Sequence, residues 1–131
     1  VLSWTWDISS RIANRLSVFS SSLVNPPYQD PALLLTPEGL AVKYLFDCGT
    51  LYNLPKAELL KITRVFLSHA HIDHLIGLDH LVRCQLYCDH TLEFYGPPPL
   101  ARQIGGRLRG YTWNSPASRR VIEELLAAPA S

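Results

Sequence analysis

Four of the five histidines of this 131-residue chain lie within residues 67–80, which read LSHAHIDHLIGLDH. The run directly before them, TRVFLS (63–68), is apolar and rich in strand-forming residues, which predicts a strand buried on both faces. The segment behind them, 75–88, repeats its apolar residues with the period of a helix. Loops at the carboxyl ends of strands bind ligands in α/β sheets. A strand, a histidine-rich loop and a helix in succession therefore predict an α/β fold with a polar site at the strand's end.

Strand and helix signals also follow one another along the rest of the chain. Turn residues Pro37 and Gly39 separate two expected strands, and Pro55 and Pro116 each stand at the first position of an expected helix. The expected strands span 17–24, 32–35, 40–46, 63–68 and 91–96, and the expected helices span 8–16, 54–62, 75–88, 97–110 and 115–128. This order predicts an α/β, layered arrangement in a single domain over residues 1–131.

The composition supports a folded domain and limits its partners. Apolar residues make up 47% of the chain and charged residues 18%, so disorder is not expected. The net charge of +1 predicts no polyanionic partner by itself, although residues 97–131 carry five Lys/Arg against two Asp/Glu. Three cysteines favour a reducing compartment, the cytoplasm, over a disulfide scaffold. No apolar run reaches the ~18–20 residues of a membrane span, so we expect no membrane partner.

The spacing of the polar residues in the cluster suits metal binding. His69 and His71 are two residues apart in an expected loop, so both imidazoles can reach one ion, while Asp73 and His74 can turn to a second. Neutral imidazole and carboxylate suit zinc, with manganese or iron as alternatives. Two ions ~3.5–4 Å apart would hold a bridging hydroxide and clamp a phosphate or carbonyl oxygen. The sequence therefore predicts a metal centre.

Other interpretations of the polar residues stay open. The cluster could be only a polar loop, and His80 and His90 fit a solvated helix position and a turn, respectively. Asp47 ends the neighbouring expected strand in LFDCGT and is therefore expected at the same rim as the cluster.

The six residues HAHIDH (69–74) are the H-x-H-x-D-H signature, and with it the chain resembles the metallo-β-lactamase-fold hydrolases. It is most similar to their ribonuclease Z-like branch, through LFDCGT, ITRVFLSHAHIDHLIGLD and LEFYGPPPLARQI within residues 25–114. The family fold is an αββα sandwich of two similar halves. The resemblance implies a metallo-β-lactamase-like sandwich of which this chain is the N-terminal half, with 115–131 as a divergent C-terminal helix.

The resemblance also assigns roles to individual residues. It implies that His69 and His71 bind one metal, and that Asp73 and His74 belong to a second. Asp73 would have a further catalytic role with the attacking water. Asp47 would be a buried carboxylate that supports the metal-binding loop from behind.

The second half of the family sandwich supplies a further histidine, a bridging aspartate and a final histidine. This chain has no aspartate after Asp89 and no histidine after His90. Two tetrahedral zinc ions need about eight ligand positions, and the motif with a bridging hydroxide fills about six. The chain also reads DCGTLYNLP where ribonuclease Z proteins usually continue with an E-G-T-Q-type segment. The resemblance therefore implies two zinc ions per complete site, and a site that is incomplete in this chain.

Two kinds of function are consistent with these observations. The first is a metal-dependent hydrolase, a phosphodiesterase or endoribonuclease similar to ribonuclease Z, acting on RNA or a nucleotide. Its missing ligands would come from further residues, or from a homodimer or partner chain. The second is a non-catalytic half-domain that serves as a structural or interaction subunit of a larger assembly. Thioesters, lactones and β-lactams, the substrates of other branches of the superfamily, also stay open.

Three arginines follow the expected strand 91–96. Arg102, Arg107 and Arg109 are candidate contacts for a substrate phosphate. A solvated helix face is the commoner explanation for such a group.

Overall fold

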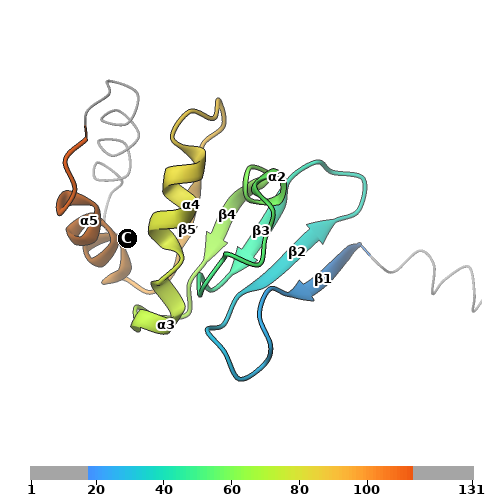
Figure 1. Ribbon diagram of the computed structural model, residues 1–131, viewed down its shortest axis with the longest axis horizontal. Coiled ribbons are helices and arrows are strands. Elements are labelled where there is room, and N and C mark those ends of the chain that lie inside the picture. The colour runs from blue at the N-terminus through green and yellow to red at the C-terminus, as the bar shows by residue number, and fades with distance from the viewer. Residues whose placement is uncertain (1–17, 114–131) are drawn as a thin grey trace, which may run out of the picture.

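The computed structural model describes residues 18–113, which form a mixed sheet with helices packed beside it (Figure 1). The strands are β1 (Phe19–Leu23), β2 (Leu33–Pro37), β3 (Lys43–Phe46), β4 (Ile62–Phe66) and β5 (Glu93–Tyr95). The helices are α2 (Lys56–Leu59), α3 (Ile72–Leu75), α4 (Leu78–Gln85) and α5 (Leu100–Arg109). The α/β class is confirmed. The helices expected at 8–16 and 115–128 lie outside the described residues.

The strands lie side by side in chain order from β1 to β5 (Figure 1). β1 and β3 pair antiparallel with β2, whereas β4 pairs parallel with both β3 and β5. β1, β3, β4 and β5 therefore run in the same direction, and their carboxyl ends meet at one edge of the sheet. This edge, with its loops 24–32, 47–55, 67–71 and 96–99, is called the site edge below.

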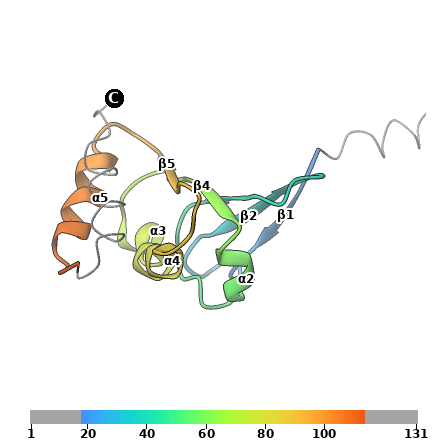
Figure 2. The same ribbon diagram turned by 90° about the horizontal axis from the view of Figure 1, so that it is seen from above.

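One face of the sheet packs against the helices. Figure 2 shows α2, α3 and α4 on the same side of the strands. Leu45 of β3 and Val65 of β4 are register partners, and both are 0% exposed. Leu78 and Leu81 of α4 are buried in the same core. Because side chains alternate between faces along a strand, this packing determines which residues point away from the helices.

The opposite face of the sheet is open as far as residues 18–113 are concerned. Phe46, Phe66 and Tyr95 stack in a row across β3, β4 and β5, with ring centroids 4.8 and 5.0 Å apart. Phe46 is 39% exposed and Tyr95 is 44% exposed. The prediction that the strand at 63–68 is buried on both faces is therefore wrong, because Phe66 is only half-buried on the side away from the helices.

The helix expected over 75–88 is divided at Gly77 into α3 and α4. The Gly77 N–H donates to the Cys48 carbonyl at 2.9 Å, and the Cys48 N–H donates to the His74 carbonyl at 2.9 Å. These two bonds join the loop after β3 to the α3–α4 junction, and they take the place of bonds within a continuous helix.

The other expected elements within residues 18–113 are confirmed with changed bounds. Most are shorter, but β2 extends to Pro37, so the prediction that Pro37 lies in the turn is wrong. The helix expected over 54–62 is the single turn α2, since Ile62 already belongs to β4 and is 0% exposed. The turn between β2 and β3 contains Gly39 at φ 74, a conformation that glycine adopts without strain.

Gly77 has no room for a side chain. An ideal Cβ there would lie 2.1 Å from the Gly49 carbonyl oxygen and 2.8 Å from Cγ of Leu51. Gly77→Ala must therefore push the junction away from the loop after β3, and we predict that it lowers the free energy of unfolding by about 2 kcal/mol or more. Gly106→Ala is the matched control, because nothing lies within 4 Å of its ideal Cβ.

In the exposed part of α5, Gly106→Ala should raise the free energy of unfolding by up to about 1 kcal/mol, since alanine favours helix. Urea denaturation of both variants measures the difference. A Gly77→Ala chain as stable as the native chain would contradict the described packing.

Candidate metal centre

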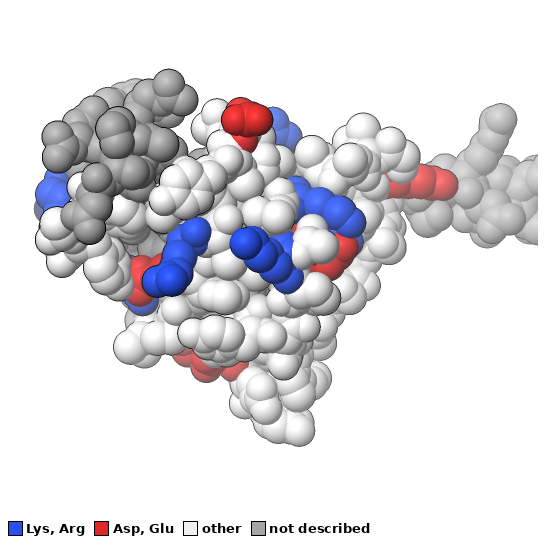
Figure 3. Space-filling model, turned by 45° about the horizontal axis from the view of Figure 1, so that its top comes forward, with Lys and Arg blue, Asp and Glu red and all other residues white. Residues whose placement is uncertain are grey.

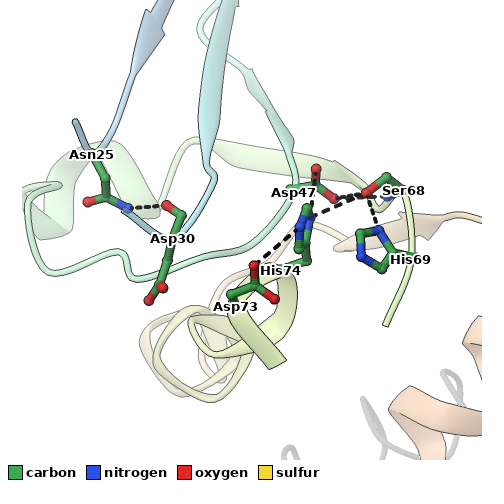
Figure 4. Close-up of polar contacts among 7 residues, drawn as sticks. All are labelled: Asn25, Asp30, Asp47, Ser68, His69, Asp73 and His74. Carbon is green, nitrogen blue, oxygen red and sulfur yellow. Dashed lines mark hydrogen bonds and ion pairs between the residues drawn. The ribbon is translucent and has the colours of Figure 1, made fainter. Parts of the chain in front are cut away.

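The loop after β4 carries the histidine motif to the site edge (Figure 4). His69 and His71 lie in this loop, and Asp73 and His74 lie in the single turn of α3. The ring centroid of His69 is 4.2 Å from that of His71 and 4.0 Å from that of His74. The structure thus brings together three imidazoles that the sequence places in one motif.

Asp47 connects the end of β3 to the histidine loop (Figure 4). Its Oδ1 accepts hydrogen bonds from the backbone N–H and the hydroxyl of Ser68, both at 2.9 Å. Its Oδ2 lies 3.1 Å from Nδ1 of His74. The backbone of Asp47 has φ 55, a left-handed conformation that aspartate tolerates better than most residues. The expectation that Asp47 meets the rim of the cluster is confirmed, although its side chain is 19% exposed rather than fully buried.

The hydroxyl of Ser68 lies between a carboxylate and two imidazoles. Besides its contact with Asp47, Oγ is 2.9 Å from Nδ1 of His69 and 3.3 Å from Nδ1 of His74. A carboxylate only accepts, so the single hydroxyl proton goes to Asp47 in the arrangement that satisfies every contact. Nδ1 of both imidazoles then carries a proton and donates it. Nε2 of both keeps its lone pair, as in the neutral histidine that binds metals.

Reasoning from the sequence missed Ser68. It directly precedes the motif, but a serine at a strand end has many roles, and only its contacts with Asp47, His69 and His74 reveal this one. His80, expected to be solvated, packs instead against the ring of Tyr52, with centroids 4.7 Å apart.

The donor chemistry of the motif fits a metal ion, but the described residues do not enclose one. Nε2 of His74 faces Oδ2 of Asp73 at 3.5 Å. With the proton of His74 on Nδ1, both atoms offer lone pairs, which suits a shared cation. Across residues 18–113, however, no three His, Cys, Asp or Glu side chains are arranged so that they could hold an ion. The assignment of His69, His71, Asp73 and His74 as metal ligands therefore stays a prediction.

Cys48 follows Asp47 in the chain and points into the core, where it is 0% exposed. Burial raises the pKa of its thiol to about 12, and the nearby positive charge of Arg107 offsets this only in part. With this pKa, Cys48 stays protonated at neutral pH and packs as an apolar residue. Because thiolate is the form that binds metals, Cys48 is not a candidate ligand.

The three candidate phosphate-binding arginines are all in α5. Arg107 is already paired with Asp79 of α4, through Nε to Oδ1 at 3.1 Å and Nη2 to Oδ2 at 2.8 Å. Burial would raise the pKa of Asp79, but hydrogen bonds from Arg107 and Tyr111 outweigh it, and the pKa lies below its ordinary value. Arg102 and Arg109 are exposed. Arg107 thus joins α5 to α4, and phosphate binding by these arginines stays a prediction.

The face of the molecule in Figure 3 carries mixed charge, with Lys and Arg side chains beside Asp and Glu side chains. Glu58 pairs with Lys43 at 2.5 Å and with Lys61 at 2.8 Å, and Arg64 pairs with Glu93 at 2.7 Å. Such partly exposed pairs contribute little to stability. Two carboxylates thus offset most of the charge of these three basic side chains, which leaves a net charge of one.

The chain belongs to the β-lactamase superfamily, because residues 43–122, more than half of it, match the β-lactamase superfamily domain. It is 33% identical over 102 residues to ribonuclease Z of Deinococcus radiodurans, covering 74% of this chain and 31% of that protein. It is 37% identical over 86 residues to ribonuclease Z of Picosynechococcus sp., covering 53% of this chain and 27% of that protein.

Solved structures agree with this family. Human tRNase Z, short form, has a TM-score of 0.53 and 27% identity, covering 70% of this chain and 36% of that one. YhfI of Bacillus subtilis, a metallo-β-lactamase-fold protein, has a TM-score of 0.53 at 23% identity, covering 72% and 41%, and shows the fold alone. The expected fold and the similarity to ribonuclease Z are confirmed, and the chain spans about a third of the length of these relatives. Among residues 18–113, no helix is long and apolar enough to cross a membrane.

The contacts of Ser68 and Asp47 predict the tautomers of the imidazoles. In the neutral form of each ring, His69 and His74 should carry their proton on Nδ1. Long-range ¹H–¹⁵N NMR correlations distinguish the two tautomers. His90 is an internal control, because its Nε2 lies 3.2 Å from Oε1 of Gln85 and must carry the proton there. Ser68→Ala should release His69 from its tautomer and leave His90 unchanged.

Nε2-protonated His69 or His74 in the native chain would contradict the hydrogen-bond arrangement described for the site.

Proposed function

We propose that this chain is the N-terminal half of a metal-dependent phosphodiesterase similar to ribonuclease Z, with RNA or a nucleotide as its substrate. The observation that carries the proposal is the grouping of His69, His71 and His74 at a rim that Asp47 organises. The similarity to ribonuclease Z over 74% of the chain supports it.

The motif residues divide between two ions in this proposal. His69 and His71 would hold one ion, and Asp73 and His74 the other. When bound, a pair of zinc ions would activate a water for attack on phosphorus and neutralise charge on the phosphate. Manganese or iron would suit the same donors.

The chain's own residues would orient the imidazoles and move a proton. Asp47 holds Nδ1 of His74 and Ser68 holds Nδ1 of His69, so Nε2 of each ring stays free. The carboxylate of Asp73 is 50% exposed at the start of α3, where it can accept a proton from the attacking water.

The remaining ligands would come from residues beyond those described or from a second chain. The open sheet face offers a place for the completing part to pack. Phe46, Phe66 and Tyr95 stack there and leave apolar surface in water, a feature typical of interaction surfaces. Residues 1–131 would then be one partial domain, with 115–131 as its divergent terminal helix.

A non-catalytic half-domain is the second candidate. One observation favours it, namely that the side chains of residues 18–113 do not enclose an ion. In that case the same open face would bind a partner within a larger assembly.

Hydrolysis by the zinc-loaded chain tests the proposal. We expect cleavage of single-stranded RNA and of bis(p-nitrophenyl) phosphate that EDTA abolishes. His71→Ala should lower kcat/KM by at least ~100-fold, the upper end of what losing an outer partner of a metal ligand costs. His71 is exposed, so the substitution should leave the fold intact.

His90→Ala is the matched control, since it makes the same chemical change outside the motif and should keep near-native activity. Activity that survives EDTA would contradict the proposal. A folded, metal-loaded chain without activity, as monomer or oligomer, would favour the half-domain.

A further inference from the structure

We propose that Tyr52, packed against His80, is a stacking platform for an unpaired base of single-stranded RNA beside the histidine motif. The ligand class rests on the proposed function. The location rests on the structure, which presents this aromatic ring to solvent at the site edge.

Most of Tyr52 is exposed to solvent. The residue is 77% exposed, and its ring centroid lies 4.7 Å from that of His80 with the planes tilted by 40°. His80 thus supports the ring from one side and leaves most of it accessible to a planar ligand.

The loop that carries Tyr52 is held firmly on both sides of it. Asn53 Nδ2 donates to Asn25 Oδ1 at 2.9 Å, and Asn25 Nδ2 donates to the Thr50 carbonyl at 2.8 Å. Leu51, the preceding residue, is 0% exposed. Because neighbouring residues are already ordered, a base that stacks on Tyr52 would cost little further loss of loop freedom.

This loop belongs to the same edge as the metal-binding motif. It begins at Asp47, and backbone hydrogen bonds join Cys48 to His74 and to Gly77 at the α3–α4 junction. His80 lies three residues beyond Gly77, in the first turn of α4. An RNA strand whose phosphate reached the motif would therefore have its neighbouring nucleotides at this edge.

A second exposed tyrosine extends the same edge. Tyr28 is 86% exposed in the loop after β1. That loop is joined to the Tyr52 loop by the Gly49 N–H, which donates to the Pro31 carbonyl at 2.9 Å, and by the hydroxyl of Thr50, which donates to Asp30 at 2.5 Å. Two aromatic side chains on adjoining loops suit a strand with several unpaired bases.

Stacking is the contact by which proteins hold single-stranded RNA without reading its sequence. It needs an accessible aromatic face, and it adds to any contact between basic side chains and the backbone phosphates. Lys43 and Lys61, which share Glu58, lie where β3 and β4 begin, at the other edge of the sheet, so they do not contribute to binding at the site edge.

Equilibrium binding of fluorescein-labelled oligoadenylate, followed by anisotropy with EDTA present, tests the inference on the full chain. Tyr52→Ala should raise the Kd by between about 5-fold and 100-fold, the range for losing one base–aromatic stack. Tyr52→Phe keeps the ring and should bind like the native chain.

Tyr87→Ala is the matched control. Tyr87 is also 77% exposed, but it follows the end of α4, away from the site edge, so its loss should leave the Kd unchanged. No binding by the native chain, equal Kd values for Tyr52→Ala and the native chain, or an equal loss in Tyr87→Ala would each overturn the inference. Inorganic polyphosphate has no base to stack. An equal Kd of polyphosphate for the native chain and for Tyr52→Ala would therefore support the inference.

The assay separates this inference from the proposed function because it needs neither metal nor cleavage. If RNA binding depends on Tyr52 but the chain hydrolyses no substrate, the inference holds and the proposed phosphodiesterase function fails. If the chain hydrolyses RNA but the Kd is the same for the native chain and Tyr52→Ala, the proposed function holds and the inference fails.

Discussion

The bond network of the Asp47 carboxylate is the interaction on which the candidate site depends. It joins the end of β3 to Ser68 and to His74, which come from a loop and a helix more than twenty residues further along the chain. Asp47 adopts a left-handed backbone to do so. Such a conformation costs free energy and persists only where the surrounding structure holds it in place. Conformations of this kind are frequent at functional sites. One carboxylate thereby determines the proton positions and orientation of two imidazoles.

Much of the fold and of the candidate site could be predicted from the sequence, because it depends on local sequence patterns. The apolar strand before the histidines, the helical period behind them and the position of Asp47 at a strand end each depend on residues close in sequence. The remainder depends on contacts between distant residues. The helix breaks at Gly77 because backbone hydrogen bonds to Cys48 replace helical ones. No residue within 75–88 indicates that Cys48 is the partner. Ser68 likewise gains its role only from Asp47.

The burial of β4 shows the same limit in another form. An apolar run predicts that a strand is covered, but not whether one face or both are covered within the same chain. Here α2, α3 and α4 lie on one side of the sheet (Figure 2), and among residues 18–113 the row of Phe46, Phe66 and Tyr95 stays partly exposed on the other. The open face and the histidine motif, which encloses no ion among residues 18–113, are consistent with each other. Both fit a chain that spans about a third of the length of its relatives.

In the proposed function, the histidine motif would be one half of a dinuclear metal centre, and the completing part would pack on the open side of the sheet. The most direct test is the zinc content per chain of protein purified without added metal, with its oligomeric state recorded by light scattering. The account predicts about two zinc ions per chain, as a dinuclear centre requires. One zinc ion or none, in monomer or oligomer, would contradict a centre that this chain completes by itself or with a second copy, and the chain would then be a partner subunit with an incomplete site.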